Sequence, residues 1–234
     1  MPRRPAPGPP ARLPAAVLWD LDGTLADTEP SWFAAEYALA AEHGAKWTDD
    51  DAHALVGSDL IESGVYIRDR MGLDLEPGAI VELLLDRVVA DACTGVTWRP
   101  GARELLDECR VADLPCALVT MSYARVVEPV LDQLPADAFA AVVTGDSVEL
   151  GKPHPEAYLR AASLLGVRPH SCVAIEDSPT GATAAESAGA HVLVVPNTVP
   201  VPDGPGRTRV PTLVGVRLGD LAALAARHAA SSMT

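Results

Sequence analysis

Lysine is scarce in this sequence, and positive charge is in deficit overall. Only Lys46 and Lys152 are lysines, and 18 Lys and Arg residues stand against 32 Asp and Glu, which gives a formal net charge of −14. A chain this acidic has no overall field that attracts nucleic acid or an anionic membrane surface. We therefore expect neither as a partner, and an anionic ligand needs a local site or a metal ion.

Long apolar runs and paired cysteines are also missing. No uncharged stretch approaches the roughly 20 residues that span a bilayer, and prolines stand where a secretory signal has its apolar segment. The four cysteines show no C-x-x-C spacing, and this usage is typical of small buried side chains in a reducing compartment. These absences predict a soluble, cytoplasmic protein.

The composition predicts a folded chain with a short leader. Hydrophobic residues make up 48% and charged residues 21% of the 234 positions. This globular balance suits one large domain or a core with a smaller insert. Residues 1–14 contain six prolines and three arginines, and we predict that they form a disordered leader.

The alternation of apolar runs with helical patterns predicts the fold class. Short apolar runs indicate buried strands of a parallel sheet, because both faces of such strands are covered. These runs span 15–19, 116–120, 172–175 and 191–195, with a weaker one at 140–144. Helical patterns lie at 102–109, 125–134, 155–165 and 180–188, and a final helix at 218–228 follows a predicted surface loop at 196–211. We predict an α/β fold with a doubly wound parallel sheet.

Residues 28–97 interrupt this alternation. They carry apolar residues at helical spacing and no convincing strand, and Pro30 and Pro77 suit the first turns of helices. We therefore predict an all-helical insert at 28–97, which separates two parts of the α/β core at 15–27 and 98–234.

Two aspartates, Asp20 and Asp22, follow the first predicted strand directly. In open α/β sheets, ligands bind beyond the carboxyl ends of the strands. One carboxylate there suits nucleophilic attack and the other suits proton transfer. A calcium loop needs glycine at its sixth position and glutamate at its twelfth, whereas here Gly23 is fourth and Ser31 is twelfth. A surface Asp-Gly turn is the structural alternative for this motif taken alone.

Two further clusters favour phosphate chemistry. Thr120 and Ser122 end the second predicted strand, and a hydroxyl with the following backbone N–H groups makes a neutral cradle for phosphate oxygens. Taken alone, such residues often merely terminate a strand. Lys152 stands in a Gly/Pro frame before a helix, where an ammonium balances the charge of a phosphoryl group and an attacking carboxylate.

A fourth cluster, Glu176 and Asp177, ends the third strand. Together with Asp20 and the Asp22 region, these carboxylates offer oxygen ligands to one hard cation, and Mg²⁺ is commonly held by a few carboxylates plus water and substrate oxygens. Taken alone, the same residues are an ordinary start of the following helix.

The four clusters, in this order, resemble the motifs of the haloacid dehalogenase (HAD) superfamily of phosphohydrolases with an aspartate nucleophile. The resemblance covers nearly the whole chain after the leader. The helical insert directly after the first motif is similar to the C1-type cap of the branch that contains phosphoglycolate phosphatase, sugar-phosphate phosphatases and β-phosphoglucomutase. It implies a HAD-like Rossmannoid core with a helical cap.

The resemblance also implies an activity and a mechanism. It implies a Mg²⁺-dependent phosphomonoester hydrolase that acts on a small phosphorylated metabolite, namely a sugar, polyol or glycolate phosphate. Asp20 attacks phosphorus and forms an aspartyl-phosphate, and Asp22 protonates the leaving oxygen and then activates water. Lys152 offsets the charge of Asp20 and the phosphate.

The ligand-binding residues implied by the resemblance fall into two groups. The phosphate is bound by Thr120, Met121 and Ser122. The metal is held by Asp20, the Asp22 carbonyl, Glu176 and Asp177.

Cap residues set the substrate in this branch, which points to Glu29, Trp32 and Gly57. A phosphosugar mutase of the β-phosphoglucomutase type is the alternative enzyme, but Trp32 replaces its histidine and Asp59 stands where its arginine grips a second phosphate. A catalytically silent HAD-fold binding or regulatory protein is the alternative without turnover. Neither the substrate nor the oligomeric state follows from the sequence, with a monomer slightly favoured.

Overall fold

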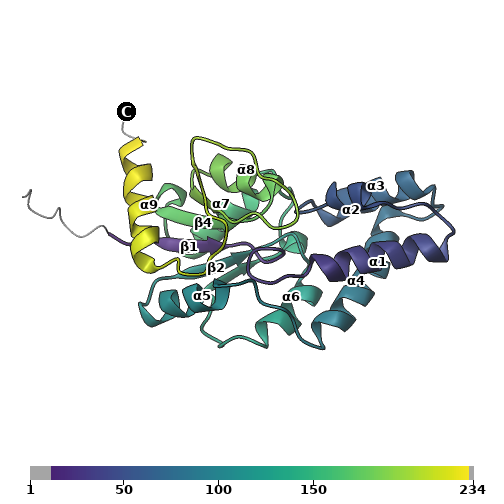
Figure 1. The fold of residues 1–234 in the computed structure, drawn as a ribbon, viewed down its shortest axis with the longest axis horizontal. Helices are drawn as coiled ribbons and strands as arrows, with labels where there is room; N and C mark the ends of the chain where they lie inside the picture. Colours follow the sequence, from purple (N-terminus) through teal and green to yellow (C-terminus); the bar gives the residue numbers. More distant parts are fainter. Residues whose placement is uncertain (1–11, 232–234) are drawn as a thin grey trace, which may run out of the picture.

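A six-stranded parallel sheet forms the centre of the larger lobe in the computed structural model, which describes residues 12–231 (Figure 1). The strand order is β3-β2-β1-β4-β5-β6, and every neighbouring pair is parallel. The strands are β1 (Ala16–Trp19), β2 (Cys116–Val119), β3 (Ala141–Val143), β4 (Cys172–Glu176), β5 (His191–Val194) and β6 (Arg207–Arg209).

The central strand β1 is apolar on both faces. Val17 and Trp19 belong to one hydrophobic core, and Ala16 and Leu18 belong to the other, because successive side chains of a strand point to opposite sides of the sheet. Helices cover both faces, so all four side chains are buried. This explains why the sequence shows a continuous apolar run instead of alternation.

Helices flank the sheet on both sides. The first core includes side chains from α5 (Ala102–Val111), α6 (Ala124–Leu131) and α9 (Leu218–Ser231). The second core includes side chains from α7 (Glu156–Leu164) and α8 (Pro179–Ser187). Two short 3₁₀ helices, η1 (Gly145–Ser147) and η2 (Pro169–Ser171), complete the lobe. The predicted doubly wound α/β fold is confirmed.

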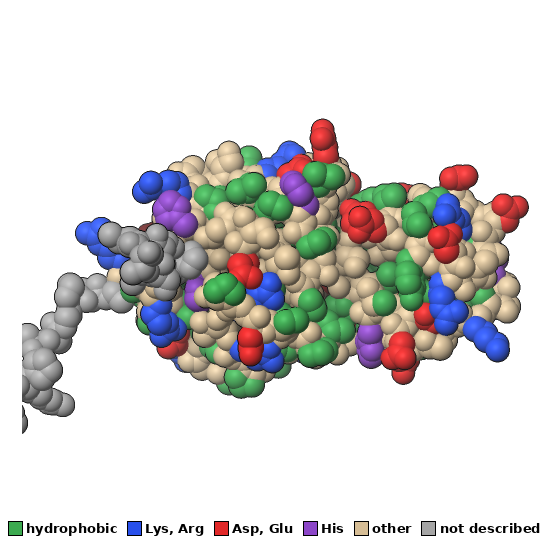
Figure 2. Space-filling model, turned by 90° about the horizontal axis from the view of Figure 1, so that it is seen from above, with side chains coloured by type: hydrophobic (Ala, Val, Ile, Leu, Met, Phe, Trp, Pro, Cys, Tyr) green, Lys and Arg blue, Asp and Glu red, His purple; other side chains and the backbone are tan. Residues whose placement is uncertain are grey.

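Four helices between β1 and β2 form a second, smaller lobe. They are α1 (Glu29–Glu42), α2 (Asp49–His53), α3 (Leu60–Met71) and α4 (Pro77–Ala92), and residues 28–97 contain no strand. Helix α4 packs against α1, α3 and α6, and the lobe has its own apolar cluster around Leu39, Ile67 and Leu85. Figure 2 shows this lobe beside the larger one, with acidic and basic side chains interspersed on the visible face.

The chain enters and leaves the helical lobe at adjacent points. Ala26 and Trp98 form an isolated antiparallel bridge. On either side of it, Asp27 N donates to Thr97 O at 2.8 Å, and Arg99 N donates to Leu25 O at 3.0 Å. The smaller lobe is therefore joined to the larger one through two connectors that lie side by side.

An edge strand lies where the sequence predicts only a loop. The predicted surface loop at 196–211 contains β6, which was missed because its residues, Arg-Thr-Arg, carry no apolar signal and join the sheet edge through backbone hydrogen bonds. The predicted leader, residues 1–14, lies outside the described residues except for its last three, which have no regular secondary structure. No described helix has both the length and the hydrophobicity needed to cross a membrane.

Candidate active site

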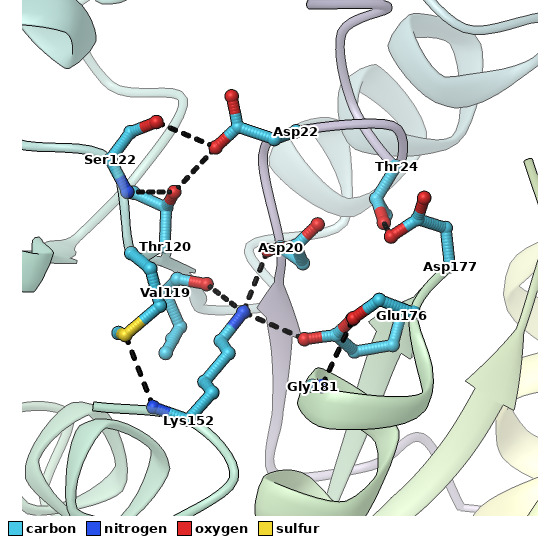
Figure 3. Close-up of polar contacts among 12 residues, drawn as sticks. Asp20, Asp22, Thr24, Val119, Thr120, Ser122, Lys152, Glu176, Asp177 and Gly181 are labelled. Carbon is cyan, nitrogen blue, oxygen red and sulfur yellow. Dashed lines mark hydrogen bonds and ion pairs between the residues drawn. The ribbon is translucent and has the colours of Figure 1, made fainter. Parts of the chain in front are cut away.

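Three neighbouring strands bring distant polar side chains to one edge of the sheet (Figure 3). Asp20 follows β1, Thr120 follows β2, and Asp177 follows β4. Because β1 lies between β2 and β4 and all three run parallel, their carboxyl ends meet at the same edge. The structure thus places three of the four sequence clusters together, and the fourth, at Lys152, reaches the same point from the loop before α7.

Lys152 lies at the centre of this arrangement with only 2% of its surface exposed. Its Nζ donates to Asp20 Oδ1 at 2.7 Å, to Glu176 Oε1 at 2.7 Å and to the Val119 carbonyl at 3.0 Å. Burial alone would lower the pKa of Lys152, but the charges of Asp20 and Glu176 outweigh it and hold the pKa above its usual value. The ammonium is therefore charged and fixed against Asp20.

Three carboxylates share this small volume. One oxygen each from Asp20, Glu176 and Asp177 lies within 4.8 Å of the others. Burial and the charge of Glu176 raise the pKa of Asp20 well above its usual value, against the opposing effect of Lys152. Burial and the charge of Asp20 likewise raise the pKa of Asp177. Three carboxylates with one ammonium carry a formal charge of −2, and such an excess is costly in a buried site unless a cation balances it.

Unpartnered oxygens show where a cation fits. Among the described residues, Asp20 Oδ2, Asp177 Oδ2 and Glu29 Oε1 are buried side-chain oxygens without a hydrogen-bond donor. Buried polar atoms are normally satisfied, and hard cations such as Mg²⁺ bind carboxylate oxygens. The residues present therefore fit a divalent cation, with Asp20 and Asp177 as carboxylates that each retain a free oxygen.

Glu176 is engaged differently from the other carboxylates of the cluster. Its Oε1 accepts from Lys152 Nζ and from the Tyr158 hydroxyl at 2.5 Å, and its Oε2 accepts from Ser178 Oγ at 3.3 Å. Both oxygens thus have protein partners, and the side chain is fully buried. In this structure Glu176 holds Lys152 in place. The sequence analysis had missed Tyr158, because it lies on the apolar face of a helix.

Glu29 lies beside Asp177 at the edge of the carboxylate cluster. Its Oε2 accepts from Asn197 Nδ2 at 3.1 Å, and a Cβ on Gly23 would lie 2.1 Å from Glu29 Oε1 and 2.2 Å from Asp177 Oδ2. Only glycine fits at position 23, where φ is also +78°. Burial raises the pKa of Glu29 to about 7. Asn197 was missed because it lies in the stretch predicted as a surface loop.

Four hydrogen bonds fix the Asp22 carboxylate. Its Oδ1 accepts from Thr28 Oγ1 at 2.6 Å and from Trp32 Nε1 at 3.3 Å. Its Oδ2 accepts from Thr120 Oγ1 and Ser122 Oγ, both at 2.8 Å. Trp32 belongs to α1 of the smaller lobe, whereas Thr120 and Ser122 follow β2, so Asp22 is held from both lobes.

The residues expected to bind phosphate also contact one another. Thr120 Oγ1 accepts from the Ser122 backbone N at 3.0 Å. The Met121 side chain is buried beneath Lys152, whose backbone N donates to Met121 Sδ at 3.1 Å. Thr120, Met121 and Ser122 therefore form one connected turn beside Asp20.

A cavity of about 70 Å³ extends from Asp20 and Lys152 into the smaller lobe. Its walls on that side are mostly apolar and come from α1, the α2–α3 connection, the start of α3, and α4: Trp32, Phe33, Glu36, Leu55, Val56, Gly57, Leu60, Val81 and Leu84. Gly57 lies against the larger lobe, since a Cβ at this position would be 2.5 Å from Ser178 Oγ. Glu36 was missed by the sequence analysis, because a glutamate within a helix is normally solvated.

Comparison with known proteins identifies the family. A family model described as haloacid dehalogenase-like hydrolase matches residues 14–189, a range that includes all four clusters of the site. The chain belongs to this hydrolase family. The HAD resemblance inferred from the motifs is thereby confirmed, and the protein is a HAD-family enzyme.

Individual HAD relatives agree with this assignment. Hexitol phosphatase A of Escherichia coli K12 is 36% identical over 183 residues, which cover 76% of this chain and 81% of that protein. Hexitol phosphatase B of the same strain is 31% identical over 223 residues, which cover 91% and 95%. Among solved structures, CbbY from Rhodobacter sphaeroides in complex with phosphate has a TM-score of 0.81 at 28% identity, and the match covers 89% of this chain and 99% of that one.

Proposed function

We propose that this HAD-family hydrolase is a Mg²⁺-dependent phosphatase of a small phosphorylated metabolite, and that Asp20 is its nucleophile. The observation that carries the proposal is the ion pair between Lys152 and Asp20, which is buried next to Glu176 and Asp177. Phosphoryl transfer depends chiefly on positioning and charge neutralisation, and this group of residues supplies both.

The two half-reactions follow from the side chains. Asp20 forms a bond to phosphorus while the bond from phosphorus to the ester oxygen breaks, and Asp22 donates a proton to that leaving oxygen. In the second half, Asp22 takes a proton from water, whose oxygen attacks phosphorus and releases Asp20 and inorganic phosphate. Lys152 stays against Asp20 throughout and offsets the negative charge.

The metal site proposed here uses the oxygens that the protein leaves free. Asp20, Asp177 and the Asp22 carbonyl would hold Mg²⁺, with Glu176 adjacent and engaged by Lys152. When bound, Mg²⁺ neutralises charge on the phosphoryl oxygens. Glu29 adds a further buried carboxyl beside Asp177, and its Oε1 has no hydrogen-bond donor among the described residues.

We further propose that residues 28–97 act as the cap, and that 15–27 with 98–234 form the catalytic core. The cavity between the lobes supports this division, because one end holds Asp20 and Lys152 and the other is lined by α1, α3 and α4. Cap closure over bound substrate would exclude water from the reacting atoms. Trp32 and Gly57 then lie beside the leaving group.

The names of the relatives favour a sugar or polyol phosphate as substrate, since two of them are hexitol phosphatases. The mutase alternative gains no support from Asp59. This aspartate accepts hydrogen bonds from the backbone N–H groups of Ile61 and Glu62 and so begins α3. Its carboxylate offers no positive charge for a second phosphate.

Phosphate release from a panel of about one hundred phosphorylated metabolites, with and without Mg²⁺, tests the proposal. Metal-dependent release is expected, together with a loss of about 10³-fold or more in Asp20→Asn, because the nucleophile is removed. Asp74→Asn is the matched control, since Asp74 is exposed between α3 and α4. Release that persists in Asp20→Asn would refute the assigned nucleophile, and the absence of release from every compound would favour a silent binding protein.

A further inference from the structure

One face of α1 runs along the cavity from the reacting edge into the cap. Glu29, Trp32, Phe33 and Glu36 are spaced at i, i+3, i+4 and i+7, which places them on the same side of a helix. Glu29 faces Asp177, and the last three line the cavity. Seven residues of helix span about 10 Å, so Glu36 lies two turns deeper in the cap than Glu29.

Glu36 is a buried acidic group without a cationic partner. Only 4% of it is exposed, and its Oε2 accepts from Trp47 Nε1 at 3.1 Å. Within residues 12–231, no Lys or Arg forms an ion pair with Glu36, and the Trp47 indole is the only side chain that donates to it. Burial raises the pKa of Glu36 to about 8, although the Trp47 hydrogen bond opposes the shift. Such a group is costly to keep in an apolar wall unless a ligand uses it.

The surroundings of Glu36 restrict what that ligand carries. Phe33, Leu55, Leu60, Val81 and Leu84 supply apolar wall. The one cation that lines the described cavity is Lys152, at the opposite end, where it is already bound to Asp20 and Glu176. A second phosphate or a carboxylate would therefore be desolvated at the cap end without a counter-charge. A hydroxyl group, in contrast, donates to an ionised carboxylate, and it donates to or accepts from a protonated carboxyl group.

We infer that Glu36 recognises hydroxyl groups at the end of the leaving group farthest from phosphorus, and that it thereby selects uncharged polyhydroxylated monophosphates over substrates with a second anionic group. The inference rests on the proposed phosphatase function and adds its specificity-determining residue. Trp47 orients Glu36 by holding Oε2, so that Oε1 remains for the substrate.

Kinetics on matched substrates test this role. We would compare glucitol 6-phosphate, which carries hydroxyls, with phenyl phosphate, which has none, and with phosphoglycolate, which has a carboxylate. Wild type should show the highest kcat/KM for glucitol 6-phosphate and the lowest for phosphoglycolate. In Glu36→Leu, the ratio of kcat/KM for glucitol 6-phosphate to that for phenyl phosphate should fall about 10- to 100-fold, because a substrate hydroxyl is left without a hydrogen-bond partner in an apolar wall.

Two variants separate recognition from a merely structural role. Glu36→Gln keeps an oxygen that accepts from Trp47, and the ratio of kcat/KM for glucitol 6-phosphate to that for phenyl phosphate should fall about 3- to 10-fold. If Glu36→Leu fails to fold, the Glu36→Gln ratio decides the test. Glu42→Gln removes an exposed carboxylate from the same helix and should leave the ratio unchanged. A ratio within threefold of wild type in Glu36→Leu, or equal losses on both substrates, would overturn the inference.

Calorimetry in the Asp20→Asn background distinguishes failure of this inference from failure of the proposed function. If wild type releases no phosphate from any compound, the proposed function fails. The affinity of the Asp20→Asn protein with Mg²⁺ for glucitol 6-phosphate still decides the role of Glu36. If the double variant Asp20→Asn, Glu36→Leu binds glucitol 6-phosphate at least tenfold more weakly than the Asp20→Asn protein, recognition by Glu36 is supported. Equal affinity of the two proteins, or no binding by either, overturns the inference.

Discussion

The two ends of the cavity bury carboxyl groups equally well but balance them differently. At the sheet edge, Asp20 is 5% exposed and lies against the Lys152 ammonium. In the helical lobe, Glu36 is 4% exposed and accepts from the neutral Trp47 indole. The ion pair of the first arrangement suits phosphoryl transfer, in which negative charge moves between oxygens. The carboxyl group of the second suits hydrogen bonds to neutral hydroxyl groups. On the proposed function, the core therefore supplies reactivity and the cap supplies selection.

Removing the ammonium should break the balance at the sheet edge and give the largest effect. In Lys152→Met, three buried carboxylates lose their only cation among the described residues. We expect unfolding free energy to fall by about 3–5 kcal/mol, the range for breaking a buried ion pair, and kcat to fall by about 10²- to 10³-fold or more. Urea unfolding and phosphate release measure the two losses.

The other lysine of the chain is the matched control for this prediction. Lys46 is exposed in the helical lobe, and Lys46→Met should change stability by less than about 0.5 kcal/mol. Equal losses of stability and of kcat in Lys152→Met and Lys46→Met would contradict the importance assigned to the buried ion pair.

A second prediction separates Asp22, which follows β1, from Asp177, which follows β4. With Mg²⁺ at one hundred times its dissociation constant, the protein should gain about 2.7 kcal/mol of stability. Asp177→Ala should lose this gain because a ligand oxygen is removed. Asp22→Ala should keep most of it, since the backbone carbonyl of Asp22 remains, although turnover falls steeply. Thermal unfolding with and without Mg²⁺ measures the difference, and identical loss of the metal effect in both variants contradicts the roles assigned.

The smallest expected effect is the contribution of Glu36, at the cap end, to the pH dependence of the unfolding free energy. The pKa of Glu36 is about 8, above its usual value of 4.5. The native state therefore retains a proton that the unfolded chain loses, and this contribution is complete below pH 4.5 and disappears as the pH rises through 8. Relative to wild type, Glu36→Gln should gain about 1–2 kcal/mol between pH 5 and pH 6.5.

Urea unfolding of both proteins at pH 5, 6.5 and 8 in the absence of Mg²⁺ gives this comparison. The difference between the two proteins removes the contribution of groups that both share, including Glu29. Parallel pH profiles would show that Glu36 titrates as an ordinary exposed acid.

The reacting edge was predictable because a parallel sheet imposes a strong geometric rule. Once apolar runs are identified as parallel strands, residues that follow them must meet at one edge, and Asp20, Thr120 and Asp177 do so. What the rule does not give is the pairing of individual oxygens. That Glu176 is occupied by Lys152 and Tyr158, while Glu29 faces Asp177, depends on side-chain directions that spacing does not specify.

The cap end was less predictable, because helix packing and not a motif decides which side chains line it. Trp32 and Glu29 were identified through a family resemblance, but Glu36 has no such signal. A glutamate within a helix is ordinarily solvent-exposed, and only the packing of Trp47 and α4 around α1 buries this one. The edge strand β6 was missed for a related reason, since Arg207–Arg209 has no apolar side chain and pairs with β5 through its backbone.

The bridge between Ala26 and Trp98 has a consequence for how such enzymes diversify. Because both connectors of the helical lobe start from neighbouring points, the chain between them can be replaced by another segment with little change in the entropy of closing the loop. Neither the strands nor their polar ends need to shift. A chimaera that joins this sheet to the helical lobe of a hexitol phosphatase should therefore fold. It should also take on the substrate preference of the protein that supplied the helical lobe.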